Sequence, residues 1–208
     1  HEEGAAHAAD GYARSTGKTG VVIATSGPGA TNLITGIATA YMDSIPMVAI
    51  TGNVAMDMLG RDSFQEIDIT GITMPITKHN YLVTDAAELA GVIREALVIA
   101  HSGRPGPVLI DVPKDITAQL AEYVPQPHYQ LRELPQPTVE SLKQAAAAIR
   151  SSKRPLIYAG GGVVAAGASE ELLAFSRRVE APISCSSMGL SAVPFDYPLY
   201  LGMIGMHG

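Results

Sequence analysis

Two segments near the start of the chain carry residue types that could do chemistry. Glu2 and Glu3 open a run rich in alanine and glycine, and a Gly-Pro-Gly turn follows at residues 27–29. The helix dipole alone favours carboxylates in a first helical turn, and glycine serves any tight turn. The residue types therefore fit either a plain helix start and turn, or a carboxyl group beside bare backbone that a flat ligand can approach.

The elements that must position these segments alternate between helix and strand. Apolar spacing predicts a helix over residues 2–16, and another is expected to begin at Pro28 and continue through 32–41. Asp85 is expected to cap a third helix. The predicted strands, short runs rich in β-branched residues, are 20–25, 46–51, 79–83 and 107–112. This alternation predicts an α/β fold with a mostly parallel sheet covered on both faces.

A second α/β unit is predicted after a proline-rich segment. Residues 121–137 hold four prolines and little periodicity, which indicates an interdomain linker. The expected domains are residues 1–120 and residues 138–208. The predicted elements of the second domain are a helix capped by Thr138, a strand at 156–159 closed by a triple-glycine turn, a helix at 169–179 and a strand at 181–184.

Composition excludes several classes of function. A net charge of −6 without any run of lysine and arginine argues against a nucleic-acid partner. No apolar run reaches the roughly 18 residues of a membrane helix, so no membrane association is expected. Cys185 is the only cysteine, which excludes an internal disulfide and indicates a reducing compartment. The six histidines lack metal-ligand spacing, so no metal site is predicted within the chain.

The order of these segments resembles the pyrimidine-binding domain of thiamin-diphosphate enzymes. His-Glu-Glu-Gly-Ala at residues 1–5 is similar to the family's glutamate motif, and residues 25–32 to its Gly-Pro-Gly turn. Phe-Gln-Glu at 64–66 and Thr-Lys-His at 77–79 are most similar to the large, catalytic subunit of acetohydroxyacid synthases. The resemblance covers the whole chain. It implies part of the pyrimidine domain followed by about half of a Rossmann-like, FAD-associated middle domain, in a fragment truncated at both ends.

The resemblance also implies catalytic roles. In this family one glutamate contacts N1′ of the cofactor's aminopyrimidine, and Glu2 matches it, with a pKa expected to be raised by a desolvated pocket. Glu3 stands where the family usually has Gln, so Glu3 remains an alternative. Phe64 and Gln65 are implied to border the substrate end of the cofactor. There the ring would exclude water and the amide would donate a hydrogen bond to a developing alkoxide. Lys78 is implied to add positive charge near the site.

Further residues are implied to bind cofactors. The glycine turn and residues 52–53 would border the pyrimidine of thiamin diphosphate, although the family more often has Gln than Asn at position 53. Arg104, the triple glycine and Met188 would border a structural FAD, while the Mg2+ ligands would lie in a C-terminal domain outside this chain. On its residues alone the triple glycine lacks the dinucleotide fingerprint. The implied cofactor-binding residues are Glu2, Gly27, Pro28, Gly29, Asn32, Gly52, Asn53, Arg104, Gly160, Gly161, Gly162 and Met188.

For the intact enzyme the resemblance implies condensation of two pyruvates, or of pyruvate and 2-oxobutyrate, with loss of CO2 in branched-chain amino-acid biosynthesis. It implies a homodimer or homotetramer, a small regulatory subunit and a bacterial cytoplasmic location. The fragment alone is expected to be inactive. Two alternatives remain open: another thiamin-diphosphate 2-oxo acid decarboxylase or carboligase, and a non-catalytic nucleotide-binding α/β module. The sequence does not decide between pyruvate and 2-oxobutyrate as the acceptor.

Overall fold

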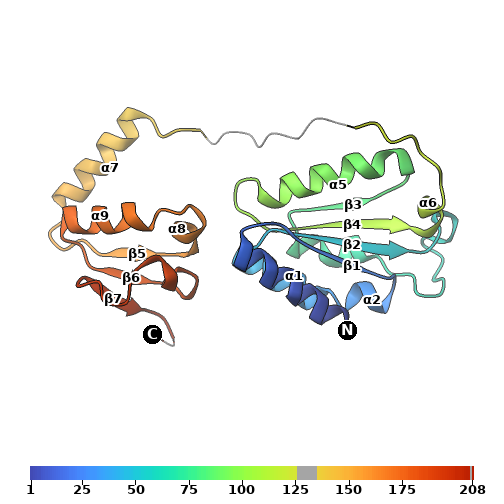
Figure 1. Ribbon diagram of the computed structural model, residues 1–208, viewed down its shortest axis with the longest axis horizontal. Helices are drawn as coiled ribbons and strands as arrows, with labels where there is room; N and C mark the ends of the chain where they lie inside the picture. Colours follow the sequence, from blue (N-terminus) through green and yellow to red (C-terminus); the bar gives the residue numbers. More distant parts are fainter. Residues whose placement is uncertain (126–134, 207) are drawn as a thin grey trace. The chain divides into compact units, whose positions relative to one another are not determined.

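The chain folds into two compact units, residues 1–134 and 135–208 (Figure 1). The computed structural model describes residues 1–125, 135–206 and 208. The predicted linker, residues 121–137, falls mostly outside these described residues. Each unit is considered by itself below.

The first unit is built on a four-stranded parallel sheet, as its sequence predicts. The strand order is β1 (Gly20–Ala24), β2 (Met47–Asn53), β4 (Pro107–Pro113) and β3 (His79–Leu82). Gly20 pairs with Met47, Met47 with Pro107, and His79 with Val108. The amino ends of all four strands therefore share one edge of the sheet, and the carboxyl ends share the other.

Helices cover this sheet through two separate apolar clusters. Helices α1 (Glu2–Thr16) and α3 (Ile34–Asp43) pack on one face, and α5 (Ala86–His101) packs on the other. Asp85 caps α5 as predicted, because its carboxylate accepts the Ala87 N–H at 2.8 Å. The helix expected from Pro28 is interrupted at residues 32–33, so it forms two helices. The remaining short helices are α2 (Pro28–Thr31), η1 (Met56–Met58), α4 (Ile69–Thr73), η2 (Met74–Ile76) and α6 (Lys114–Thr117).

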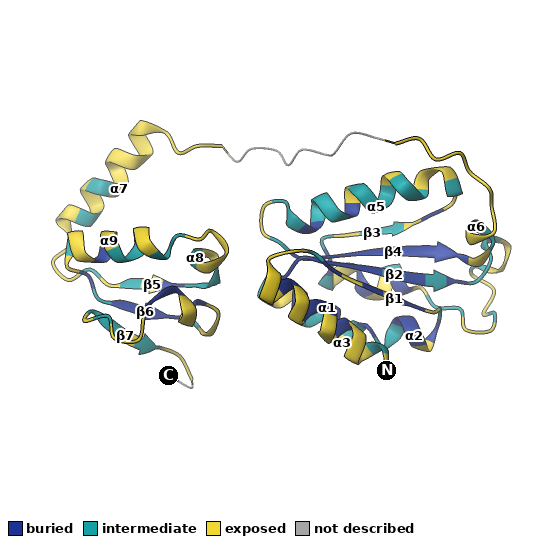
Figure 2. Cartoon of the chain, viewed as in Figure 1, coloured by how far each residue is buried: buried dark blue, intermediate teal, exposed yellow. Residues whose placement is uncertain are grey.

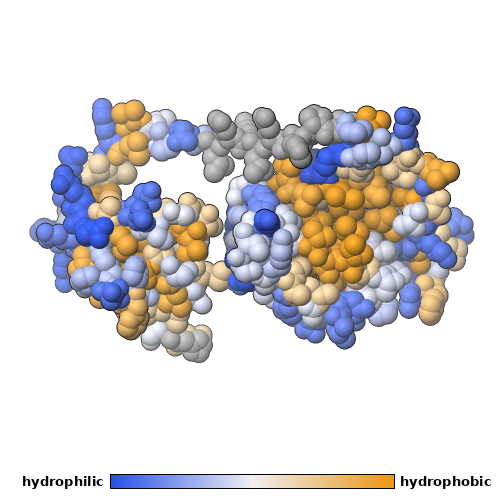
Figure 3. Space-filling model, in the orientation of Figure 1, coloured by the Kyte–Doolittle hydropathy of each residue, from blue (hydrophilic) through white to orange (hydrophobic). Residues whose placement is uncertain are grey.

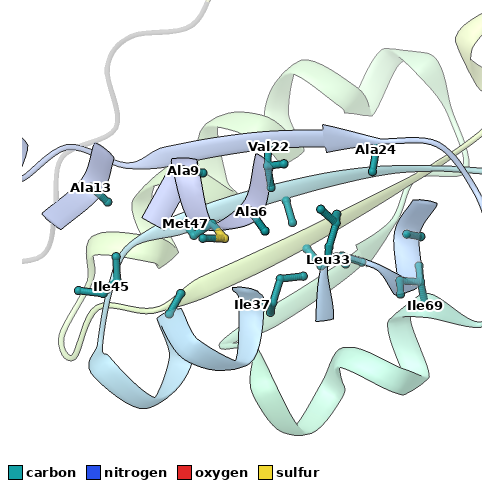
Figure 4. Packing of buried hydrophobic residues seen from close by; sticks show 14 residues of the cluster. Ala6, Ala9, Ala13, Val22, Ala24, Leu33, Ile37, Ile45, Met47 and Ile69 are labelled. Atoms are coloured by element: carbon teal, nitrogen blue, oxygen red, sulfur yellow. The ribbon is translucent and has the colours of Figure 1, made fainter. Parts of the chain in front are cut away.

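Small residues let α1 lie close to the sheet and to α3. Ala6, Ala9 and Ala13 belong to one buried cluster with Val22 and Met47, and Figure 4 shows Ala6 and Ala9 near these two side chains. A Cβ at position 20 would lie 2.1 Å from the Ala9 carbonyl oxygen, and one at position 36 would lie 2.4 Å from the Ala6 Cβ. This close packing fixes α1 along β1 and sets the start of the helix at the carboxyl edge of the sheet.

Burial differs sharply between the central and edge strands (Figure 2). Strand β4 is buried at every residue, whereas β1 alternates. Val21 and Ile23 of β1 are 52% and 72% exposed, and Figure 3 shows a broad apolar area on the first unit. The expectation of a sheet covered on both faces is therefore correct for β4 and wrong for β1, because α5 packs over the neighbouring strands.

The second unit contains a three-stranded parallel sheet, in the order β5 (Ile157–Ala159), β6 (Ile183–Cys185), β7 (Tyr200–Met203). Helix α7 (Val139–Ser151) is capped by Thr138, as predicted, and α9 (Ser169–Val179) has its predicted bounds. The triple glycine is more than a turn, because Gly160 caps a short helix, α8 (Gly161–Ala165). Strand β7 and the 3-10 segment η3 (Ser187–Ala192) were not expected from the sequence.

Two negative findings apply to the described residues only. No helix among them is long and apolar enough to cross a membrane. Within the same ranges, no group of three or more His, Cys, Asp or Glu side chains could hold a metal ion.

Candidate active site at the carboxyl edge of the first sheet

Glu2 and Asn32 meet where α1 begins. The His1 imidazole caps this helix by accepting the Glu3 N–H at 3.3 Å, which leaves the Glu2 carboxylate on the first turn. The Asn32 amide, directly after α2, donates to Glu2 Oε2 at 3.0 Å. The hydrogen bond joins residues 30 positions apart, and it fixes the orientation of one carboxylate at the edge of the sheet.

The glycine turn lies against the same carboxylate. Gly27 has φ 60° and ψ −121°, a conformation open to glycine, and Pro28 begins α2 behind it. A Cβ at position 29 would lie 2.6 Å from Thr25 Cγ2 and 3.5 Å from Glu2 Oε1. Glycine at 29 therefore avoids a clash with Thr25 and keeps the space beside the Glu2 carboxylate free of a side chain.

Gln65 reaches this turn from the long loop after β2. A Cβ at position 27 would lie 2.8 Å from the Gln65 carbonyl oxygen and 2.9 Å from the Gln65 Cβ. Gln65 itself has φ 60°, and the neighbouring Phe64 is 87% exposed. The structure thus brings together Glu2, the turn at residues 27–29, Asn32 and Gln65, called the Glu2 cluster below, with Phe64 next to it.

The end of β2 adjoins the turn, but the Asn53 side chain makes its hydrogen bonds inside the first unit. A Cβ at position 52 would lie 3.6 Å from the Ser26 nitrogen. Asn53 is buried, and its amide donates to Asp111 Oδ2 at 2.5 Å and to the Ile67 carbonyl at 3.4 Å. The Asn53 side chain therefore ties β2 to β4 and to the end of the long loop, and its implied cofactor contact stays a prediction.

Asp111 is a residue of this edge that sequence reasoning missed. It is buried in β4 and also accepts a hydrogen bond from Thr51 Oγ1 at 2.6 Å. Burial raises the pKa of Asp111, and the hydrogen bonds from Thr51 and Asn53 partly oppose this rise. The signal was present in the sequence, since an aspartate inside the apolar run of residues 107–112 requires buried partners.

The second unit brings the triple glycine and Met188 together. A Cβ at position 161 would lie 3.0 Å from the Met188 Cβ, so a side chain there would require Met188 to shift slightly. A Cβ at 160 would lie 3.7 Å from Ser186 Oγ, and one at 162 would meet nothing within 4 Å. Gly160 and Gly162 therefore leave backbone that a ligand could approach at the carboxyl edge of the second sheet, where α/β proteins bind ligands.

Two family profiles match the chain. The N-terminal, cofactor-binding domain of thiamine pyrophosphate enzymes matches residues 1–72, and their central domain matches residues 142–208. Thiamine pyrophosphate is the same compound as thiamin diphosphate. The chain belongs to the thiamine pyrophosphate enzymes.

Curated relatives match over the whole chain. An acetolactate synthase of Arthrospira platensis is 51% identical, and an acetolactate synthase large subunit of Corynebacterium glutamicum is 50% identical. The large subunit of acetolactate synthase isozyme 2 of Escherichia coli K12 is 52% identical. Each alignment covers 100% of this chain but only 37%, 34% and 38% of the respective relative. The resemblance to this subfamily of thiamine pyrophosphate enzymes is confirmed.

In this member of the thiamine pyrophosphate enzyme family, the pKa of Glu2 differs from expectation. Its pKa is lowered, not raised, because the Asn32 amide donates to the carboxylate, and desolvation only partly opposes this. The side chain is partly open to water in the described residues. A ligand covering it would remove that water and shift the pKa of Glu2 upward.

Lys78 lies away from the Glu2 cluster. It immediately precedes β3, at the amino edge of the sheet, and its Nζ donates to the carbonyls of Ile99 and Ser102 at the end of α5. A lysine at a helix C-terminus satisfies carbonyls that lack helical partners. Its partial burial lowers the pKa of Lys78. Within one copy of the chain, the implied role of Lys78 beside Glu2 is not supported.

Arg104 lies at the same amino edge. Its Nε donates to Ser44 Oγ at 2.7 Å and its Nη2 to the Met42 carbonyl at 3.1 Å, so it joins the loop before β4 to the end of α3. The side chain is exposed. Any contact of Arg104 with FAD would therefore take place away from the Glu2 cluster of the same chain.

A surface cavity of about 350 Å³ lies elsewhere, between the C-terminal ends of α7 and α9 in the second unit. Arg150, Lys153 and Arg178 line it. Helix C-termini favour cations through the helix dipole, which accounts for Arg150 and Arg178. We assign no ligand to this cavity.

Proposed function

We propose that this chain is part of the catalytic subunit of an acetohydroxyacid synthase. The observation that carries the proposal is the Glu2 cluster, in which a carboxylate, an orienting amide and a bare glycine turn meet at one sheet edge. The names of the relatives, acetolactate synthases at about half identity, favour this subfamily over other 2-oxo acid decarboxylases. We further propose residues 1–120 as the pyrimidine domain and 138–208 as part of the middle domain.

The cluster fits the aminopyrimidine of thiamin diphosphate, which when bound supplies a nucleophilic carbon able to add to 2-oxo acids. Glu2 would share a proton with N1′, a task for a carboxyl group whose pKa rises when a ligand covers it. Asn32 would hold the carboxylate in one orientation through its 3.0 Å hydrogen bond. Gly29 would admit the flat ring, because a side chain there would lie 3.5 Å from Glu2 Oε1.

Phe64 and Gln65 would act on the substrate side. The Phe64 ring is 87% exposed next to the cluster, so it is free to cover a bound ligand and exclude water. The Gln65 amide would donate a hydrogen bond to an oxygen that gains negative charge. Pyruvate would be the donor 2-oxo acid, and pyruvate or 2-oxobutyrate the acceptor.

Further parts of the proposal concern Mg2+, FAD and the partner subunits. The relatives are more than twice as long as this chain, and the Mg2+ ligands would be found in the additional length. Gly160 and Gly162 would approach a structural FAD. The words "large subunit" in the relatives' names favour association with a small regulatory subunit. We also propose that the intact protein is a homodimer or homotetramer in the bacterial cytoplasm.

The test is product analysis with a protein of the relatives' full length that contains this chain. Thiamin diphosphate, Mg2+, FAD and pyruvate would be added to the parent and to Glu2→Gln. Acetolactate from the parent, with a rate loss of roughly 10²- to 10⁴-fold in the variant, is the expected result. Acetaldehyde as the product would indicate a decarboxylase, and no consumption of pyruvate would contradict the proposal. The 208-residue chain alone is expected to form no acetolactate.

A further inference from the structure

The loop that carries Phe64 and Gln65 has an unfavourable backbone. Gly60, Asp62 and Gln65 all have positive φ, at 76°, 52° and 60°. Two of the three are not glycine, and left-handed conformations are unfavourable for residues with a Cβ. Three such positions within six residues persist only where other interactions hold the backbone in place.

The Glu66 carboxylate supplies those interactions. Its Oε1 accepts the Gly60 N–H, and its Oε2 accepts the N–H groups of Arg61 at 3.3 Å and Ser63 at 2.9 Å. The Ser63 hydroxyl also donates to Oε2 at 2.9 Å. Convergent backbone N–H groups form an anion-binding nest. Here the anion is a carboxylate of the same loop, and these hydrogen bonds lower the pKa of Glu66.

The nest encloses the two residues implied in substrate binding. Phe64 and Gln65 lie between Ser63 and Glu66, and the Glu66 N–H donates to the Ser63 carbonyl at 3.0 Å. Both ends of this short turn are therefore fixed, one by the carboxylate and one by the backbone. The Gln65 backbone that results is the part that packs over Gly27.

We propose that Glu66 is a positioning residue, whose carboxylate holds residues 60–66 in the conformation that presents Phe64 and Gln65 beside the Gly27 turn. Glu66 acts through Gln65 and Phe64, because its own carboxylate is engaged by the loop backbone. The nest is a property of the described structure. The expected effect of Glu66 on the reaction of the substrate rests on the proposed function.

The first test measures the loop alone, by amide hydrogen exchange on the 208-residue chain. In Glu66→Ala, the amides of Gly60, Arg61 and Ser63 are expected to exchange on the order of tenfold faster than in the parent, because each loses a charged acceptor. Glu95→Gln, an exposed change on α5, is the matched control and should leave these amides unchanged. Unchanged exchange in Glu66→Ala would overturn the proposal.

The second test separates positioning from general stability. In the full-length protein, Glu66→Ala is expected to lower kcat/KM for pyruvate by about tenfold or more, while the dissociation constant of thiamin diphosphate stays near that of the parent. Faster loop exchange with unchanged kcat/KM would overturn the positioning role. A parent that forms no acetolactate would refute the proposed function instead, and the exchange result would still decide whether Glu66 holds the loop.

Discussion

Replacing Gly27 with alanine tests the contact on which the Glu2 cluster depends. The change adds one methyl group at a residue with φ 60° and ψ −121°. That methyl would lie 2.8 Å from the Gln65 carbonyl oxygen and 3.0 Å from the Gln65 Cα, distances that require the loop backbone to move. Gly27→Ala is therefore destabilising through both its own backbone and the neighbouring loop.

Gly17→Ala provides the matched control. Gly17 ends α1 with φ 69°, and a Cβ there would meet nothing within 4 Å. Alanine in a left-handed conformation costs about 1–2 kcal/mol, so Gly17→Ala should lose about that much. Gly27, with ψ −121°, lies outside the left-handed helical region, so the backbone cost of alanine there is at least as large as at Gly17. Overpacking adds about 1–3 kcal/mol, so Gly27→Ala should lose at least about 2 kcal/mol.

The assay is urea unfolding of the 208-residue chain, followed by far-ultraviolet circular dichroism at equal protein concentration. The free energy of unfolding should fall further for Gly27→Ala than for Gly17→Ala. Combining Gly27→Ala with Glu66→Ala should give a smaller loss than the sum of the single changes, because a released loop can move away from the methyl group. Equal losses for the two glycine variants would refute the packing of Gln65 on Gly27.

Two further predictions concern ionisation. Asn32→Ala should raise the pKa of Glu2 toward its ordinary value, since the amide is the largest cause of its lowering; an NMR titration of the Glu2 carboxyl carbon that gives an unchanged pKa would contradict this. The pKa of Asp111 is higher in the folded state than in the unfolded state. Between these two pKa values the folded state therefore binds more protons than the unfolded state. The contribution of Asp111 to stability should fall as pH rises from the ordinary carboxyl range through the raised pKa. Asp111→Asn should lack this part of the pH dependence in urea unfolding, and identical pH profiles would refute the linkage.

Features that depend on local sequence were predictable. The alanine and glycine spacing of residues 2–16 predicts α1, and the apolar run at 107–112 predicts the buried strand β4. Asp85 and Thr138 are helix caps because their side chains reach N–H groups two or three residues away. Such interactions involve neighbours in the chain, so the residue types suffice to predict them.

Contacts between distant segments were not predictable in the same way. The bond from Asn32 to Glu2 spans 30 residues, and the buried set of Asp111 with Thr51 and Asn53 spans about 60. Lys78 adjoins the end of α5 only because β3 and β4 pair in parallel. Motif similarity placed Glu2 and Gln65 near one ligand, but the hydrogen-bond partners of each side chain follow from the packing of the sheet.

The exposure of one side of β1 was also not predictable from its sequence. Val21 and Ile23 are apolar and β-branched, which is typical of a strand buried on both faces. The composition of a strand does not specify how far the neighbouring helix extends, and α5 covers β2 and β4 while these two side chains remain open.

The comparison of Glu2→Gln with Glu3→Gln tests the central claim most directly. Both variants remove one carboxylate from the first turn of α1, but only Glu2 is bound by Asn32 and faces Gly29. The measurement is the rate at which the full-length protein exchanges the C2 proton of bound thiamin diphosphate for deuterium. The account predicts a loss of roughly 10²- to 10⁴-fold for Glu2→Gln and a rate near the parent's for Glu3→Gln. A large loss in Glu3→Gln with little change in Glu2→Gln would contradict the assignment.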